Sequence, residues 1–448
     1  MKLAVVGGGG FRTPHVWEAV VDSRIEVADL VLHDRSAARL GRMAAVLKGL
    51  RAERGYGPPV RATTDLADAV DGADVVFCAI RVGGLDGRVV DETVPLREGV
   101  LGQETVGPGG ICYALRTVPV MLDIARVVAA RAPGAWFLNF TNPAGLVTEA
   151  VRPVLGERAI GICDSPEALC ARVAAALRRR RSELRFDYAG VNHLGWLLGV
   201  RDGERDLLPG LLADDAALAR LDECALFGAA RLRALGAIPN EYLVYYESPA
   251  AIVDAFRRAG ATRAEVLRAQ QSRFYDDPED EPRAALASWR RARDARYGTY
   301  MAEAWETVPG SAHADPLDEG PGEAGYAAVA AAFVRAAAGA GRDRVVLDVA
   351  NRGRVPFLDD DAVVEVPCEV GPEGAEPLGV GRLPPGQAEL VARVKEVERI
   401  TIAAATRRSR ALALEALAAH PVVPSRPVAR RILAGYLESS PGLAETLR

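Results

Sequence analysis

Lys2-Leu3-Ala4-Val5-Val6-Gly7-Gly8-Gly9-Gly10-Phe11-Arg12-Thr13 is the stretch that decides the fold of this 448-residue chain. A short apolar run leads directly into four glycines, and a helical pattern begins at Pro14. Glycines permit a tight turn and let backbone N–H groups approach a pyrophosphate at the N-terminus of the next helix. The spacing departs from strict G-x-G-x-x-G because Arg12 stands where the third glycine would be.

A carboxylate stands where such a loop needs one, since Asp34 closes a second β-like run at residues 29–34. It can accept hydrogen bonds from both ribose hydroxyls of a dinucleotide. The alternative is a glycine-rich turn that binds nothing. We favour NAD over NADP because Asp34 would repel a 2′-phosphate, although Arg35 and Arg39 weaken this preference. The predicted cofactor-binding residues are Gly7, Gly8, Gly9, Gly10, Phe11, Arg12, Thr13, Asp34 and Ile80.

Short apolar runs alternate with helical segments over the first third of the chain. This alternation predicts an α/β fold, a Rossmann-like, doubly wound parallel sheet. The expected strands cover residues 2–6, 29–34, 74–80, 135–140 and 158–162, and the expected helices include 37–54 and 115–132. Sites in such sheets lie beyond the carboxyl ends of the strands. Arg81, Asn142 and Cys163 each follow a strand, so we expect them to converge.

The pattern changes after about residue 168, where long helices dominate. The expected helices cover residues 166–181, 214–235, 326–340 and 385–420, with another from 426, and strand-like pieces occur at 345–349 and 362–368. We therefore predict an NAD-binding Rossmann-like domain at residues 1–168. A C-terminal α+β domain is predicted at residues 169–448.

The composition excludes several classes of protein. The chain is 49% hydrophobic and 26% charged with a net charge of −5, and its longest basic run is Arg178–Arg181, so nucleic-acid binding has little support. No apolar stretch approaches the ~20 residues that span a bilayer, and we expect no membrane association. The N-terminus lacks the pattern of a signal peptide, and the six cysteines are scattered. Both observations favour a cytoplasmic protein with reduced thiols.

Two short motifs offer a thiolate and an imidazole. They are Gly161-Ile162-Cys163-Asp164-Ser165-Pro166 and Gly190-Val191-Asn192-His193-Leu194-Gly195-Trp196. A strand, a helix and a second strand fit between Cys163 and His193, which could then meet in space and bind a metal. Two protein ligands leave positions open for substrate oxygens. Taken singly, Cys163 could be a small buried hydrophobe and His193 a hydrogen-bonded core residue.

Two further groups could move protons. Asp164 could be a general acid or could orient the site, or it could only cap the helix that starts near Pro166. The stretch Ile238-Pro239-Asn240-Glu241-Tyr242-Leu243-Val244-Tyr245-Tyr246 supplies three tyrosines. A nearby divalent metal could lower the pKa of a tyrosine enough for it to act as a base. Tyr245 and Tyr246 could equally be core aromatics.

In these motifs the chain resembles the NAD- and manganese-dependent glycosidases of glycoside hydrolase family 4, especially the 6-phospho-β-glucosidase branch. The resemblance covers nearly the whole chain. The fold of this family is also similar to that of lactate and malate dehydrogenases. Besides the Cys163 and His193 motifs and Tyr242 to Tyr246, it is carried by Arg81-Val82-Gly83-Gly84-Leu85, Asp91-Glu92, Gly102-Gln103-Glu104-Thr105-Val106-Gly107, Asn139-Phe140-Thr141-Asn142-Pro143-Ala144-Gly145, Glu398-Arg399-Ile400-Thr401 and Ala419-His420-Pro421.

The resemblance implies hydrolysis of a glycoside by oxidation, elimination, addition and reduction, an exception to the usual pair of carboxylates. C3 of the sugar is oxidised by NAD, Tyr242 removes the C2 proton, and the glycosidic oxygen leaves with Asp164 or a water as acid. Cys163 and His193 would bind Mn²⁺ or another divalent metal. The resemblance also implies that the C-terminal domain binds substrate and metal and that the protein forms a homodimer or homotetramer. The residues that the resemblance places at the sugar, its phosphate or the metal-bound water are Arg81, Glu104, Asn142, Asn192 and Arg263.

Some residues depart from the family pattern. Asp164 follows the metal cysteine, as in branches that act on α-linkages, whereas many phospho-β-glucosidases have Asn there. Residues 309–315 lack the arginine and tyrosine often found in the family, and Arg263 matches a phosphate-binding arginine only approximately. We expect a glycosidase acting on 6-phospho-β-glucosides. The alternatives are an NAD-dependent sugar or hydroxy-acid dehydrogenase, a family-4 α-glycosidase acting on a non-phosphorylated sugar, and a non-catalytic NAD sensor.

Overall fold

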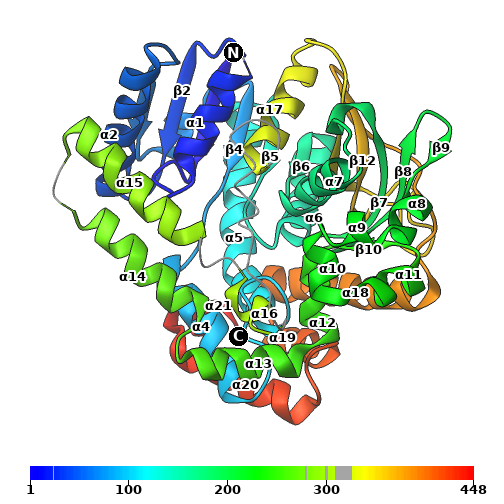
Figure 1. The fold of residues 1–448 in the computed structure, drawn as a ribbon. Coiled ribbons are helices and arrows are strands. Elements are labelled where there is room, and N and C mark those ends of the chain that lie inside the picture. The colour runs from blue at the N-terminus through cyan, green and yellow to red at the C-terminus, as the bar shows by residue number, and fades with distance from the viewer. Residues whose placement is uncertain (24, 278–279, 298–300, 308–324) are drawn as a thin grey trace.

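The computed structural model describes residues 1–23, 25–277, 280–297, 301–307 and 325–448. Within this part of the chain, one mixed sheet of 13 strands lies at the centre (Figure 1). The strands are β1 (Lys2–Val6), β2 (Asp29–His33), β3 (Val60–Thr63), β4 (Val75–Cys78), β5 (Trp136–Asn139), β6 (Ala159–Gly161), β7 (Arg185–Val191), β8 (Leu194–Asp202), β9 (Arg205–Asp206), β10 (Ile238–Pro239), β11 (Asp343–Ala350), β12 (Val363–Gly371) and β13 (Gly374–Pro377).

The N-terminal half of the sheet is parallel, in the order β3-β2-β1-β4-β5-β6. This order is that of the doubly wound dinucleotide-binding fold, and it confirms the predicted fold class. The sheet continues beyond β6 through the antiparallel strands β11, β12, β7, β8 and β10. The predicted domain boundary at residue 168 therefore falls within a shared sheet, and the division into two domains stays a prediction.

Helices cover both faces of the sheet. Those of the first part are α1 (Thr13–Asp22), α2 (Ala37–Arg54), α3 (Leu66–Val70), α4 (Gly84–Arg97), α5 (Pro108–Arg131), α6 (Ala144–Leu155) and α7 (Ser165–Ala176). The middle of the chain forms α8 (Leu208–Ala213), α9 (Asp215–Leu218), α10 (Asp222–Phe227), α11 (Ala229–Leu235), α12 (Val244–Glu247), α13 (Pro249–Ala259), α14 (Arg263–Tyr275), α15 (Pro282–Tyr297) and α16 (Ala302–Trp305). The remainder forms α17 (Tyr326–Ala337), α18 (Pro385–Arg407), α19 (Arg410–Ala419), α20 (Arg426–Ser439) and α21 (Pro441–Thr446).

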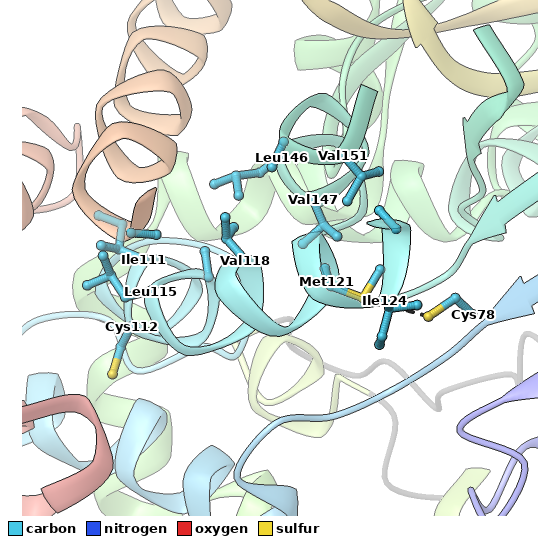
Figure 2. Packing of buried hydrophobic residues seen from close by; sticks show 14 of the residues in the cluster. Cys78, Ile111, Cys112, Leu115, Val118, Met121, Ile124, Leu146, Val147 and Val151 are labelled. Carbon is cyan, nitrogen blue, oxygen red and sulfur yellow. Dashed lines mark hydrogen bonds between the residues drawn. The ribbon is translucent and has the colours of Figure 1, made fainter. Parts of the chain in front are cut away.

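Alternate residues of the central strands enter separate cores on the two sides of the sheet. Ala4 and Val6 of β1 pack with α5, α6 and the C-terminal helices, whereas Leu3 and Val5 pack with α1, α2, α15 and α17. This is the two-residue periodicity of a strand that is covered on both faces. Figure 2 shows the first core, in which α5 and α6 present apolar side chains to each other and Cys78 at the end of β4 contacts Met121.

Two helices from the second half of the chain return to the nucleotide-binding half. In Figure 1, α14 and α15 run along the outer side of the molecule toward α2. Arg42 of α2 donates a hydrogen bond from Nε to the Phe274 carbonyl at 3.1 Å, and Trp289 of α15 donates from Nε1 to the Phe11 carbonyl at 2.9 Å. Trp289 therefore ties α15 to the glycine loop from 278 positions away, and Arg42 ties α2 to α14.

Several predicted helix bounds were wrong. The single helix expected at 214–235 is three short ones, because Leu221 is extended between α9 and α10 and Gly228, with a φ of +81°, separates α10 from α11. The helix expected at 385–420 breaks at Arg408, whose φ is +55°, and Ser409 then caps α19 by accepting a hydrogen bond from the Leu412 N–H. Among the described residues, no helix is long and apolar enough to cross a bilayer.

Candidate active site

The glycine loop between β1 and α1 leaves no room for side chains. Gly7 has a φ of +91°, and a Cβ built on it would lie 2.4 Å from the Ala79 carbonyl oxygen. A Cβ on Gly8 would lie 2.7 Å from the Leu32 Cβ, and one on Gly9 would lie 2.9 Å from an Asp34 carboxylate oxygen. Real Cβ atoms do not approach other atoms so closely, so the backbone here must consist of glycine.

The carboxylate predicted to bind ribose lies beside this loop. Asp34 follows β2, and its carboxylate lies next to Gly9. Tyr275 of α14 donates a hydrogen bond from its hydroxyl to the Gly9 carbonyl at 2.9 Å, and the Arg39 guanidinium lies 4.1 Å from the centre of the Tyr275 ring. Sequence reasoning missed Tyr275, because nothing in the sequence connects α14 with the loop. The strand, glycine cradle and carboxylate fit a dinucleotide.

The other residues predicted to bind the cofactor have contacts that support the loop. The ring of Phe11 packs edge-on against Phe274 at 5.7 Å, and Thr13 donates a hydrogen bond from Oγ1 to the Gly8 carbonyl at 3.0 Å. Ile80 follows β4 and receives the Tyr113 hydroxyl proton on its carbonyl at 3.2 Å. Arg12 Nη1 lies 4.0 Å from an Asp164 oxygen. Their direct roles in cofactor binding stay predictions.

Cys163 lies just beyond the end of β6, where the parallel strands of the sheet end. Its side chain is buried, with 5% exposed. Burial, together with the negative charges of Glu365, Asp164 and Asp348, raises the pKa of the Cys163 thiol well above its ordinary value. A cation at this position would reverse that balance, because metal binding stabilises the thiolate.

His193 occupies the turn between β7 and β8. Its backbone is left-handed, with a φ of +62°, which is uncommon for a residue other than glycine, asparagine or aspartate. Nδ1 lies 2.9 Å from the Thr105 Oγ1. Burial lowers the pKa of His193 to about 4, against the opposing charges of Asp164 and Glu104. The imidazole is therefore neutral near pH 7 and has a lone pair available for a metal.

The donor set suits a catalytic divalent cation better than a structural one. Among the described residues, no three His, Cys, Asp or Glu side chains form a ready metal cage. Structural sites are usually closed by four protein ligands, whereas catalytic sites keep positions open. A thiol and a neutral imidazole, which share the electrostatic environment of Asp164, fit the second type.

Tyr242 lies against the imidazole. The two rings are parallel within 3°, and their centres are 4.0 Å apart. Tyr242 follows Asn240, whose side chain accepts a hydrogen bond from the Tyr242 N–H at 3.0 Å and begins a short helical turn. The next tyrosine, Tyr245, is a core residue that donates its hydroxyl proton to Glu303 at 2.7 Å. The structure thus brings two predicted residues, His193 and Tyr242, into direct contact.

A small cavity lies beside Tyr242. It is lined by Arg88, Glu92, Gln103, Glu104, Tyr242, Tyr245, Phe256, Arg263, Met301 and Glu303. One oxygen of Glu104 lies 2.5 Å from Arg81 Nη2 and 3.0 Å from Arg88 Nη1. Burial opposes the charge of Glu104, but Arg81, Arg88 and Arg296 outweigh it and hold the pKa of Glu104 below its ordinary value. Glu104 and Arg263, both predicted, therefore line one cavity, and Arg81, also predicted, pairs with Glu104.

Positive charge accumulates near this cavity. Burial and the neighbouring charges of Arg12, Arg263 and Arg88 lower the pKa of Arg296 well below its ordinary value. Arg263 Nη2 lies 3.5 Å from the Arg296 carbonyl, so α14 and α15 meet here. Guanidinium groups bind anions such as phosphate through charge-assisted hydrogen bonds. Residues 309–315, where sequence reasoning noted missing phosphate-site residues, lie outside the described part of the chain.

The two predicted asparagines have different surroundings. Asn142 is half-buried in the loop after β5 and precedes Pro143 in a cis peptide. The Asn192 side chain accepts a hydrogen bond from the Ala144 N–H at 3.0 Å and donates one to Glu365 at 3.1 Å. Asn192 therefore ties the turn that carries His193 to the loop that carries Asn142. Contacts of either asparagine with a sugar stay predictions.

A buried pair of carboxyl groups lies behind the predicted metal ligands, and sequence reasoning did not find it. Asp348 and Glu365 are direct cross-strand partners on β11 and β12, flanked by Gly161 on β6 and Gly190 on β7. A Cβ on Gly161 would lie 2.6 Å from the Asp348 Cβ, so the glycine makes room for the acid. Burial raises the pKa of both carboxyl groups. Tyr188 donates its hydroxyl proton to Glu365 at 3.0 Å.

Arg88 and Thr105 were also missed as site residues. Arg88 is 4% exposed and contacts Glu92 at 2.7 Å, one helical turn along α4. An arginine four residues before a glutamate is typical of an ordinary ion pair on a helix, so this spacing does not indicate a substrate site. Thr105 stands in the quoted motif next to Glu104 but carries no obvious chemistry by itself.

Comparison with known proteins settles the family. A family model described as family 4 glycosyl hydrolase matches residues 2–179, and the model of the C-terminal domain of this family matches residues 188–423. The chain belongs to glycosyl hydrolase family 4. This confirms the resemblance inferred from the motifs around Cys163, His193 and Tyr242.

Curated relatives within family 4 match the chain over almost its whole length. It is 31% identical to a 6-phospho-alpha-glucosidase of Lacticaseibacillus paracasei, covering 96% of this chain and 95% of the relative. It is 30% identical to a probable 6-phospho-beta-glucosidase of Bacillus subtilis, with 98% and 96% covered. Among solved structures, the 6-phospho-beta glucosidase of Thermotoga maritima, with NAD and glucose-6-phosphate, superposes with a TM-score of 0.82 at 26% identity over 99% of both chains.

Proposed function

We propose that this chain hydrolyses 6-phosphoglucosides by the NAD- and metal-dependent oxidation–elimination route of family 4. The observation that carries the proposal is the parallel stack of Tyr242 on His193 at 4.0 Å, beside a cavity lined by Glu104, Arg88 and Arg263. A base, a metal ligand and anion-binding groups thereby occupy one place. The glycine loop and Asp34 fit NAD, and solved relatives contain NAD and Mn²⁺.

The cofactors would supply chemistry that no side chain offers. NAD accepts and returns a hydride, and a divalent cation acts as a Lewis acid on substrate oxygens. Cys163 and His193 would hold the cation. The protein then contributes placement, exclusion of water and proton transfer.

Tyr242 is suited to remove the proton next to the oxidised carbon. The positive charge of Arg88 interacts with Tyr242, and this charge is held in place by Glu92 and Glu104. Stacking on His193 orients the ring, so that its hydroxyl keeps one position relative to the metal ligand.

The basic cluster supports a substrate that carries a phosphate. Arg88, Arg263 and Arg296 lie near a cavity in which Glu104 is already paired with two arginines. A phosphate dianion offers three acceptor oxygens, and arginines bind such groups with two parallel hydrogen bonds.

The two candidate substrates differ in the anomer of the glycosidic bond. The motifs resemble the β-specific branch most, and we propose a 6-phospho-β-glucoside as the first candidate. Asp164 favours a 6-phospho-α-glucoside as the second, because a carboxyl group stands beside the metal cysteine, as in branches acting on α-linkages. Its side chain is 37% exposed and lies near Arg12 of the glycine loop, where it can reach solvent and exchange protons.

A panel of nitrophenyl glucosides tests the proposal. The α and β anomers, each with and without a 6-phosphate, would be assayed with NAD⁺ and Mn²⁺ under reducing conditions. We expect release of nitrophenol only from the phosphorylated pair, with no net formation of NADH. Turnover of the non-phosphorylated sugars, or NADH accumulating in step with product, would contradict it. The ratio of the two phosphorylated rates decides between the anomers.

Tyr242→Phe tests the base against a matched control. Removing a general base typically slows a reaction by a factor of about 10² to 10⁴. We expect a loss of kcat in this range, with KM for substrate nearly unchanged. Tyr436→Phe is the control, because Tyr436 is a buried tyrosine outside the cavity lining whose hydroxyl binds the Asp91 carbonyl at 3.0 Å. Equal effects of the two variants would refute the role of Tyr242.

A further inference from the structure

We propose that Thr105 and Gln103 fix which ring nitrogen of His193 carries the proton, and so prepare Nε2 to bind a divalent cation. The inference rests on the proposed role of His193 as a metal ligand. It assigns a positioning role to two residues that would not touch the metal. A chain of hydrogen bonds leads from Gln103 through Thr105 to the imidazole.

The side-chain oxygen of Gln103 is fixed by the backbone. It accepts hydrogen bonds from the Thr105 N–H at 2.6 Å and from the Val106 N–H at 2.7 Å. Because backbone N–H groups only donate, the atom that faces them must be the amide oxygen and not the amide nitrogen. Gln103 is 7% exposed, so the arrangement is closed to bulk water.

The hydroxyl of Thr105 then has one possible direction. Its Oγ1 lies 3.0 Å from the same Gln103 oxygen. An amide oxygen cannot donate, so the hydroxyl proton must lie between the two atoms, or two lone pairs would face each other at that distance. Thr105 has a single hydroxyl proton, which is now committed to Gln103.

The third step reaches the imidazole. Thr105 Oγ1 lies 2.9 Å from His193 Nδ1, and it can only accept there because its proton points to Gln103. Nδ1 must therefore carry the ring proton. With the proton on Nδ1, a neutral imidazole has its lone pair on Nε2. A metal-bound histidine commonly has its second nitrogen held in this way, which fixes both the tautomer and the ring orientation.

The orientation of the ring is fixed as well as its proton. The imidazole is hydrogen-bonded to Thr105 on one edge and stacked on Tyr242 across one face. Rotation about the bond to the ring would break both contacts. Thr105 thus also keeps Nε2 at a constant position relative to the Tyr242 ring.

Three variants of the full-length chain, kept with NAD, separate this role from a structural one. Thr105→Val keeps the shape and removes the hydroxyl, whereas Thr105→Ser restores it. Thr117→Val is the matched control, because Thr117 is fully buried and its Oγ1 has no hydrogen-bond partner among the described residues. The thermal midpoint of each variant shows that it folds.

The first readout is the tautomer itself. Histidine labelled with ¹⁵N in the ring would be incorporated, the metal removed with a chelator, and the signals of the five histidines assigned with a His193→Asn variant. We expect the proton on Nδ1 in the wild type, Thr105→Ser and Thr117→Val, and movement of the proton to Nε2 in Thr105→Val. A wild-type ring protonated on Nε2, or an unchanged ring in Thr105→Val, would overturn the proposal.

The second readout is affinity for Mn²⁺ alone, measured by titration without substrate. Loss of a residue that supports a metal ligand typically weakens binding by a factor of about 10 to 100. We expect this loss in Thr105→Val and wild-type affinity in the other two variants. Equal affinities throughout would overturn the proposal. Neither readout uses catalysis, so an enzyme that failed to hydrolyse phosphoglucosides would refute the proposed function and leave this inference standing.

Discussion

The glycine loop of residues 7–13 and the pocket around Tyr242 are maintained by opposite means. The loop is kept in shape by the absence of side chains, since a Cβ on Gly7 would come within 2.4 Å of a backbone oxygen. The pocket depends on side chains that bind one another, such as Glu104 with Arg81 and Arg88, or His193 with Thr105. Adding atoms should therefore damage the loop, and removing polar atoms should damage the pocket.

Replacing Cys163 with Ser has the largest expected effect and separates the two regions. A neutral hydroxyl is a far weaker ligand for a divalent cation than an anionic thiolate, so we expect Mn²⁺-dependent activity to be abolished. The affinity for NAD should remain that of the wild type, because the glycine loop is untouched. Calorimetric titration with NAD and an activity assay at saturating Mn²⁺ measure the two effects. Full activity in this variant would rule out Cys163 as a ligand.

Gly7→Ala reverses the test. The new alanine must keep a positive φ, and its methyl group must displace the Ala79 carbonyl. We therefore expect the free energy of unfolding to fall by ~3 kcal/mol, with loss of NAD binding. Gly41→Ala is the control, because Gly41 lies within α2 and a Cβ there would have no atom within 4 Å. Alanine there should raise the free energy of unfolding by about 0.5–1 kcal/mol. Urea unfolding measures the free energy of unfolding of both variants. A similar loss of stability in both would contradict the expected difference.

Asp348→Asn tests a buried carboxyl group near Cys163 through the pH dependence of the free energy of unfolding. Burial raises the pKa of Asp348 from 3.8 to about 7, with Lys395 opposing and Glu398 adding to the shift, and Glu365 faces it across the strands. The folded state therefore holds the proton more tightly than the unfolded chain, and stability falls as the pH rises from about 4 to 7. The neutral amide removes this dependence.

We expect Asp348→Asn to be more stable than the wild type at pH 8, by ~1–3 kcal/mol, and the difference to shrink at pH 5. Denaturant unfolding at the two pH values measures it. A variant that is less stable than the wild type at pH 8 would show that the buried carboxyl group is ionised and paired.

The difference between the two regions also explains what could be predicted from the sequence. The glycine loop and Asp34 were recognisable because steric requirements act between neighbours in the chain. The parallel strands were recognisable from their apolar runs, except β3, an edge strand whose Arg61 is exposed. The break of α18 from α19 at Arg408 was not, because a positive φ in arginine has no signature in the sequence.

The pocket could be predicted only through its family motifs. Cys163, His193 and Tyr242 were identified from the residues that flank them. Their supports come from distant segments, as with Glu365, which is 173 positions from Asn192 but hydrogen-bonded to it. Nothing in the spacing of such residues connects them. Arg88 and Thr105 were overlooked because an ion pair on a helix and a single threonine are common in any protein.

If the sugar is oxidised and cleaved by elimination, Tyr242 exchanges the proton at C2 with solvent. Hydrolysis of a 6-phosphoglucoside in deuterated water tests it most directly, with the released sugar analysed by mass spectrometry and NMR. We predict one deuterium at C2, because the proton that the base removes is replaced from solvent. A product without label at C2 would contradict the mechanism.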